Sequence, residues 1–202
     1  MSASQADFVQ SIISQIGYNS KQELIEKLFI QSLSDSHHRI DKTIGNENEI
    51  RDRFVKDLYQ TDSKIKKWLQ KKYIDVIWEN WVFTPDFELA RTDIAFKLTG
   101  LHFILECKRL KSADKAYIDE GVERFITLKY AKGDEYAGMI GFVISGDKHA
   151  ISKGLQWKIK ALAHTQSIEK TSKPFFNSIH NRNDTSQIEL YHLFFDFVIS
   201  ST

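Results

Sequence analysis

The stretch that decides the fold is TPDFELARTDIAFKLTGLHFILECKRL, residues 84–110. Two runs with strand-like patterns flank Thr99-Gly100, a pair of residues suited to a tight turn. If a hairpin is centred on that turn, the numbers of opposed residues sum to a constant. Three opposed pairs are then apolar and share one face, because side chains alternate along a strand: Leu98–Leu101, Phe96–Phe103 and Ile94–Leu105. This match predicts the register of the hairpin.

The same register places charged residues on the opposite face. Asp93 falls opposite Glu106, and Lys108 shares the face of Glu106. Opposed carboxylates repel each other unless a positive partner offsets their charge. Lys108 is one such partner and a divalent cation is another, since Mg²⁺ and Mn²⁺ prefer oxygen ligands. Asp86 has the opposite parity, and the preceding Pro85 predicts a turn there instead.

The segments TDIAF and FILECKRL resemble the active-site hairpin of the PD-(D/E)xK nuclease superfamily, the restriction-endonuclease-like fold. In that family an aspartate begins the second core strand and a Glu-x-Lys lies on the third. The matching residues here are Asp93, Glu106 and Lys108, with Cys107 between the last two. Thr92 stands where the family name has proline. The resemblance implies that the three matching residues are catalytic, and that Asp93 and Glu106 bind Mg²⁺ or Mn²⁺.

Members of that family often add an acidic residue from the helix before the sheet, and Glu47 and Glu49 are the candidates here. Helical spacing places Glu47 on the apolar stripe that begins at Ile50, so its side chain is expected to face the sheet. Glu49 follows Asn46 by three residues and is placed to cap the helix. We expect Glu47 to join the metal site. The alternative is a first-turn acid that interacts only with the helix dipole.

Two basic residues are candidates for contacts with nucleic acid. Arg124 shares a helix face with Tyr117 and Glu120, and relatives use this helix to complete the site or touch phosphates. Lys111 lies just past the third strand. For Arg124 the alternative is an exposed pair with Glu120 beside a packed tyrosine. Lys111 is open to the same solvent-exposed interpretation.

The pattern along the whole chain predicts an α/β fold class. Helices are expected over residues 6–16, 20–33, 47–60, 62–73, 115–130 and 151–164, with a loop over residues 34–45. Beside the hairpin, strands are expected over residues 73–83, 137–146 and 187–199. This order matches a restriction-endonuclease-like mixed sheet core: helix, three antiparallel strands, helix and strand, with extra N-terminal helices.

Two regions follow from this layout. Residues 1–45 are expected to form an N-terminal helical segment that packs outside the core and meets another chain, as a homo-oligomer or with a partner subunit. Residues 46–202 are expected to form the nuclease-like domain. The element order extends the resemblance over residues 46–145.

Composition limits the class of protein. In 202 residues there is one cysteine, which excludes a disulfide framework within the chain and a zinc site of several cysteines. No secretory signal or membrane-spanning run is evident, so we expect a cytoplasmic protein without a membrane partner. The net charge is +1, which does not indicate nucleic-acid binding, although residues 62–73 carry five lysines against one aspartate. A solvated surface is the alternative interpretation of that cluster.

Histidines give no second site. His37-His38 and the HNRND segment around His180 lack partners at ligand spacing and are expected in loops. His192 is expected to be a satisfied core or edge residue. The sequence therefore predicts a Mg²⁺-dependent endonuclease that hydrolyses phosphodiester bonds, with DNA as the expected nucleic acid. The resemblance implies a role in bacterial restriction or anti-phage defence. The alternative is a nuclease-fold binding or assembly subunit of a larger nucleic-acid-processing complex.

Overall fold

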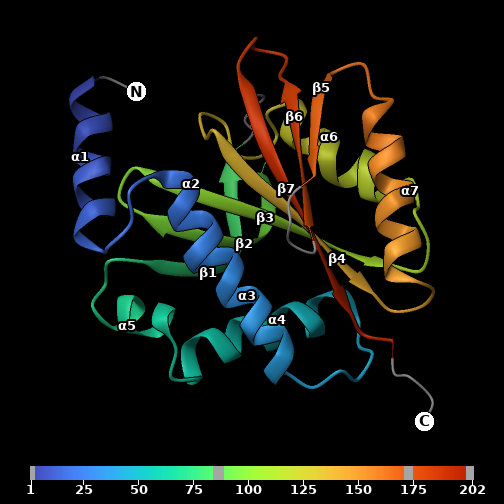
Figure 1. The fold of residues 1–202 in the computed structure, drawn as a ribbon, viewed down its shortest axis with the longest axis horizontal. Coiled ribbons are helices and arrows are strands. Elements are labelled where there is room, and N and C mark those ends of the chain that lie inside the picture. Colours follow the sequence, from blue (N-terminus) through green and yellow to red (C-terminus); the bar gives the residue numbers. More distant parts are fainter. Residues whose placement is uncertain (1–2, 84–88, 171–174, 199–202) are drawn as a thin grey trace.

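A seven-stranded mixed sheet organises the chain in the computed structural model, which describes residues 3–83, 89–170 and 175–198 (Figure 1). The strand order is β1-β2-β3-β4-β7-β6-β5. The strands are β1 Asp75–Phe83, β2 Leu89–Leu98, β3 Leu101–Leu110, β4 Tyr136–Val143, β5 Thr165–Lys170, β6 Phe175–Asn181 and β7 Gln187–Asp196.

The direction of the strands changes across the sheet. β1, β2 and β3 pair antiparallel, as the sequence predicts for the first three strands. β4 then lies parallel to both β3 and β7, while β5 and β6 extend the sheet by antiparallel pairing. The predicted sheet was too small, because β5 and β6 were missed. His180 lies in β6 and is fully buried, so the expected loop position for it is wrong.

Helices cover both faces of this sheet. The α-helices are α1 Ala3–Gln15, α2 Lys21–Leu24, α3 Gln31–Arg39, α4 Glu47–Gln60, α5 Lys64–Gln70, α6 Glu123–Ile126 and α7 Lys148–Lys160. Two π-helical segments, η1 Ile25–Ile30 and η2 Ile118–Val122, join α2 to α3 and lead into α6. The helix expected over residues 115–130 is therefore shorter than predicted and has a π-helical first half.

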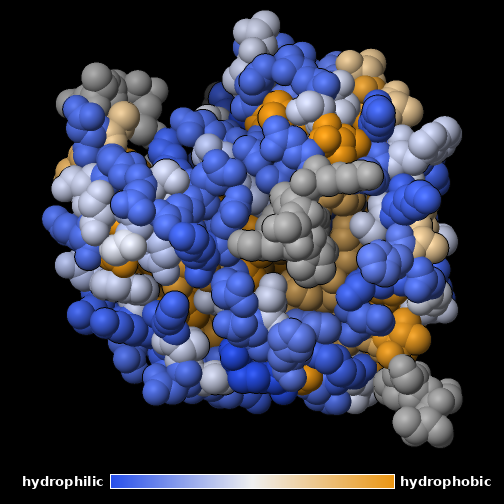
Figure 2. Space-filling view, in the orientation of Figure 1, coloured by the Kyte–Doolittle hydropathy of each residue, from blue (hydrophilic) through white to orange (hydrophobic). Residues whose placement is uncertain are grey.

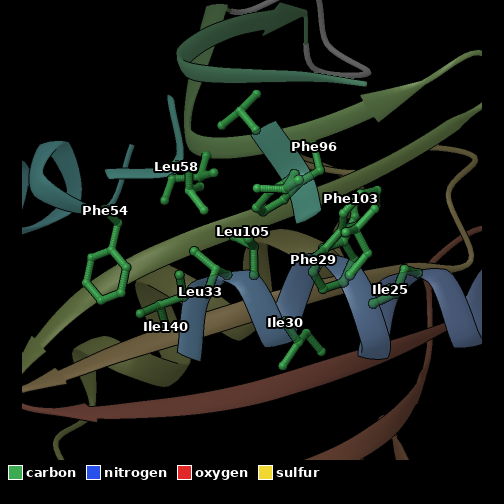
Figure 3. Packing of buried hydrophobic residues seen from close by; sticks show 14 of the residues in the cluster. Ile25, Phe29, Ile30, Leu33, Phe54, Leu58, Phe96, Phe103, Leu105 and Ile140 are labelled. Atoms are coloured by element: carbon green, nitrogen blue, oxygen red, sulfur yellow. The ribbon is translucent and has the colours of Figure 1, made fainter. Parts of the chain in front are cut away.

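The N-terminal helices belong to the main core. Phe29 of η1 stacks on Phe96 of β2 with ring centroids 4.6 Å apart, and it also stacks on Phe103 of β3. Figure 3 shows the Phe29 side chain lying beside Phe103 of the hairpin. The expectation that these helices pack outside the core is wrong. Their apolar side chains cover the same sheet face as α4, which removes that face from water.

The same run of helix continues further than the sequence predicts. The expected loop over residues 34–45 begins only after Arg39, at the end of α3. His37 packs on Phe195 of β7, and its Nε2 lies 2.8 Å from the backbone oxygen of Asp196. Burial lowers the pKa of His37 to about 4. The loop prediction for His37 and His38 is wrong, because contacts with the sheet stabilise a polar helical turn.

The opposite face of the sheet has a second apolar cluster beneath η2, α6 and α7. A chain of polar groups lies buried beside it. The Ser178 hydroxyl lies 2.7 Å from Nε2 of both His180 and His192, and the Tyr117 hydroxyl lies 3.0 Å from Nδ1 of His192. His192 is thus a satisfied core residue, as predicted.

The outer surface facing the viewer in Figure 2 is mainly hydrophilic, as expected for helices that bury one apolar face.

Candidate active site

The β2–β3 hairpin has the predicted register. The pairs are Ile94–Leu105, Phe96–Phe103 and Leu98–Leu101, and all six side chains belong to the core under the N-terminal helices. Gly100 has a φ of +75°, a left-handed conformation that explains glycine at the turn. The apolar pattern was therefore sufficient to fix this part of the site.

Asp93 directly precedes Ile94, which forms the pair farthest from the turn. Its Oδ2 accepts a hydrogen bond of 2.7 Å from the backbone nitrogen of Cys107. The carboxylate therefore lies against the Glu-Cys-Lys segment, as the register predicts. Asp93 is 8% exposed and Glu106 2% exposed, so the structure places two nearly buried carboxylates at one point of the hairpin.

Glu106 is the most constrained group of the cluster. Its Oε1 accepts hydrogen bonds from Lys108 Nζ at 2.9 Å and from Arg124 Nη1 at 2.6 Å. Its Oε2 is buried and has no hydrogen-bond partner among the described residues. Burial, and next the negative charge of Asp93, raise the pKa of Glu106 to about 7, despite the two cations beside it. At neutral pH both the acid and the carboxylate form of this group are therefore populated.

Glu47 reaches the cluster from the start of α4. Its Oε2 accepts a 2.9 Å hydrogen bond from the backbone nitrogen of Arg109, and its Oε1 lies 4.0 Å from Lys108 Nζ. Burial raises the pKa of Glu47. Glu49 instead forms the capping box with Asn46. Both helix positions agree with the prediction from helical spacing, and Lys108 lies between Glu47 and Glu106.

Arg51 is a central residue that the sequence reasoning missed. It is only 1% exposed, and its Nη1 lies 3.3 Å from Asp93 Oδ1. Its Nη2 donates hydrogen bonds to Asp52 at 2.7 Å and to Glu79 at 3.1 Å. A signal was present, because Arg51 follows Glu47 by four residues and so shares its helix face.

Arg124 and Lys111 have different positions. Arg124 binds Glu106 rather than Glu120, and its Nη1 also donates to the Tyr130 hydroxyl at 3.0 Å. The expected alternative, an exposed pair with Glu120, is not what the structure has. Lys111 is exposed in the turn after β3, and its contact with nucleic acid stays a prediction. Asp86 lies outside the described residues.

The donor set fits a hard divalent cation. Among the described residues, no three His, Cys, Asp or Glu side chains form a ready-made metal cage. Mg²⁺, however, is usually held by one or two carboxylates, with water and substrate oxygens completing the shell. Asp93 and Glu106 supply two neighbouring carboxylates, and the unpartnered Glu106 Oε2 is an acceptor that such a cation would satisfy.

Comparison with protein families, curated proteins and solved structures finds no match for this chain. No helix in the described ranges is long and apolar enough to cross a membrane.

Proposed function

We propose that this chain is a metal-dependent nuclease that hydrolyses phosphodiester bonds, with DNA as the expected substrate. The observation that carries the proposal is the environment of Glu106. This buried carboxylate has one oxygen bound by Lys108 and Arg124 and the other without a partner, and Asp93 lies beside it. Buried acidic and basic groups with shifted pKa values often cluster at catalytic sites. Such a cluster suits a charged substrate, such as a phosphodiester, and a reaction in which negative charge develops.

Asp93 and Glu106 would hold the cation in this site, and we propose that Glu47 joins them, since its carboxylate interacts with both Lys108 and Asp93. A bound Mg²⁺ would supply Lewis-acid chemistry and make a coordinated water more acidic. The protein's own task is to hold the carboxylates in place. Arg51 does this for Asp93, because its guanidinium lies 3.3 Å from that carboxylate and also contacts Glu79 at 3.1 Å.

Lys108 and Arg124 are suited to the phosphate. Burial alone would lower the pKa of Lys108, but the Glu106 carboxylate beside it outweighs burial and raises the pKa, so the ammonium stays charged. On our proposal Lys108 orients the attacking water and stabilises negative charge that develops on phosphate oxygens. Arg124 would exchange part of its contact with Glu106 for a phosphate oxygen, for which its planar guanidinium is well suited.

We also propose a restriction-endonuclease-like core with a PD-(D/E)xK site. The order α4, β1-β2-β3, η2–α6 and β4 supports a restriction-endonuclease-like core, and the positions of Asp93, Glu106 and Lys108 support the PD-(D/E)xK resemblance. We further propose a role in bacterial restriction or anti-phage defence, a cytoplasmic location and assembly with another chain.

One observation favours the alternative of a binding or assembly subunit. Asp93 and Glu106 are each already paired with an arginine, Arg51 and Arg124, so the cluster is compensated by the protein's own cations. Buried, charge-compensated pairs of this kind also occur in folds where they have no catalytic role, because each charge needs a partner once it is removed from water.

The two functions are separated by a cleavage assay. The full chain is incubated with supercoiled plasmid and with single-stranded DNA across a Mg²⁺ titration, beside Glu106→Gln as a matched control. Our proposal predicts that cleavage requires Mg²⁺ and Glu106. Binding of DNA without any metal-dependent cleavage would instead support the binding-subunit alternative.

A further inference from the structure

A groove lies between α4 and β1, next to the candidate active site. It has a volume of about 410 Å³ and is lined by Asp52, Val55, Lys56, Tyr59, Gln60 and Trp78. Two aromatic rings form most of its exposed apolar surface: Tyr59 is 41% exposed and Trp78 is 47% exposed, whereas Val55 is buried. Their ring centroids are 6.4 Å apart with an interplanar angle of 65°. Large aromatic surface left open to water at this position calls for an explanation.

The groove is joined to the site by direct contacts. Asp52, which lines the groove, accepts a 2.7 Å hydrogen bond from Arg51. Glu79, the residue after Trp78, accepts another from Arg51 at 3.1 Å. Arg51 in turn contacts Asp93. Because an α-helix rises about 1.5 Å per residue, Tyr59 lies roughly 18 Å along α4 from Glu47, so the groove extends from the site along one helix.

Lysine side chains lie in the groove and at its far end. Lys56 is one of the residues that line the groove. At its other end, Lys66 Nζ donates a 2.9 Å hydrogen bond to the backbone oxygen of Gln60. Lys66 belongs to α5, a helix with three lysines and no acidic residue, which the sequence analysis identified as a basic segment. An aromatic groove between a carboxylate site and a lysine-rich helix matches the alternation of bases and phosphates along a single strand.

We infer that this groove binds an unpaired nucleobase of the nucleic-acid strand whose phosphodiester occupies the active site. The base stacks on Trp78 beside Tyr59, and Lys56 and Lys66 bind the phosphates that follow. This inference rests on the proposed function and adds a substrate class: a strand that is unpaired beside the scissile bond. Stacking is tolerant of sequence because every base has a π face, so the groove selects strand state rather than sequence.

The test measures binding without cleavage. The full chain carrying Glu106→Gln is titrated into a fluorescein-labelled single strand of about 12 nucleotides. It is also titrated into the blunt duplex of the same sequence, at the same salt concentration. Fluorescence anisotropy gives both Kd values with Trp78 intact, with Trp78→Ala and with Trp78→Phe. The matched control is Trp157→Ala, which removes a 72% exposed tryptophan from α7 on the other face of the sheet. Thermal melts verify folding, and light scattering gives the mass of each variant.

The inference predicts that Trp78→Ala raises the Kd for the single strand about tenfold or more, the equivalent of one stacked base. Trp78→Phe should keep most of the affinity, and Trp157→Ala and duplex binding should change less than about twofold. An unchanged single-strand Kd in Trp78→Ala, equal losses on both substrates, or no binding at all would each overturn the inference. A lower mass of the Trp78→Ala protein with unchanged DNA binding would also overturn it, in favour of a protein partner. Trp78-dependent single-strand binding, together with no Mg²⁺-dependent cleavage by the chain with Glu106 intact, would leave the single-strand groove standing and reject only the nuclease.

Discussion

Arg124 Nη1 lies 2.6 Å from Glu106 Oε1, while the second oxygen of the same carboxylate has no hydrogen-bond partner among the described residues. One side of Glu106 is therefore held by cations, and the other side is buried and unsatisfied. A buried acceptor without a partner costs free energy, so this arrangement is stabilised by whatever completes it, whether a proton or a cation.

Protonation of Glu106 gives the first prediction. Burial raises its pKa from the ordinary 4.5 to about 7 in the folded state, so the folded protein binds this proton more tightly than the unfolded chain. The resulting contribution to stability is complete below about pH 4.5 and is lost as the pH rises through about 7. Glu106→Gln removes this loss, which is on the order of 3 kcal/mol. Urea denaturation from pH 5 to pH 8 should show the variant gaining on the native protein; parallel curves would contradict the assignment.

Metal binding should follow the same titration. A ligand carboxylate has to be deprotonated, so Mg²⁺ competes with the proton on Glu106. We expect Mg²⁺ to raise the thermal midpoint more at pH 8 than at pH 6, and to have little effect on Glu106→Gln. Differential scanning fluorimetry with and without Mg²⁺ measures this directly. A shift that is equal at both pH values, or that persists in the variant, would place the cation elsewhere.

Arg51 and Asp93 should be energetically coupled. Removal of one partner from a buried ion pair leaves an uncompensated charge, so Arg51→Met should destabilise the fold by about 3–5 kcal/mol. In an Asp93→Asn background the same change should cost less, with a coupling of about 1–3 kcal/mol. Urea denaturation of the four proteins gives the cycle. Lys115→Met serves as the control, because the pair of Lys115 with Asp119 is exposed and should contribute less than about 1 kcal/mol. Additive effects of the Arg51 and Asp93 substitutions would refute the coupling.

Much of this site could be predicted because its determinants are local. The hairpin register follows from three matched apolar pairs, and the orientation of Glu47 follows from the spacing of one helix. Arg51 was missed because its partners Asp93 and Glu79 are far away in the sequence, and a helical arginine is usually solvated. Arg124 was identified as a candidate, but the π-helical segment η2 that precedes it changes the helical spacing, and no residue pattern predicted that segment.

The missing strands have a similar explanation. β5 has one apolar residue, Ile168, and the apolar residues of β6 (Phe175, Phe176 and Ile179) do not alternate, so neither shows the pattern of a half-buried strand. In β6 the buried Ser178 hydroxyl forms hydrogen bonds with His180 of the same strand and with His192 of β7. These hydrogen bonds form only when the strands come together in the folded sheet, so the sequence of β6 alone gives no pattern that predicts them.

That polar chain should make the protein sensitive to acid. Burial lowers the pKa of His180 from 6.5 to about 4, so the unfolded chain binds this proton first. Stability should therefore fall as the pH decreases from about 6.5 towards 4. His180→Gln should make this decrease shallower whatever its effect at pH 7, whereas His149→Gln, at an exposed position on α7, should not. Urea denaturation at pH 7, 6, 5 and 4 provides the slopes; an unchanged slope in His180→Gln would exclude His180 as the group responsible.

The most direct test of the nuclease compares Lys108→Met and Asp93→Asn in a plasmid-nicking assay across Mg²⁺ and Mn²⁺ titrations, with a thermal melt of each protein. Lys108→Met should keep its fold and lose cleavage by on the order of a hundredfold or more, because Lys108 acts where charge develops. Excess Mn²⁺ should partly restore Asp93→Asn, whose defect is in metal binding, and should not restore Lys108→Met. Undiminished cleavage by well-folded Lys108→Met protein would contradict the central claim that the Asp93, Glu106 and Lys108 cluster performs the reaction.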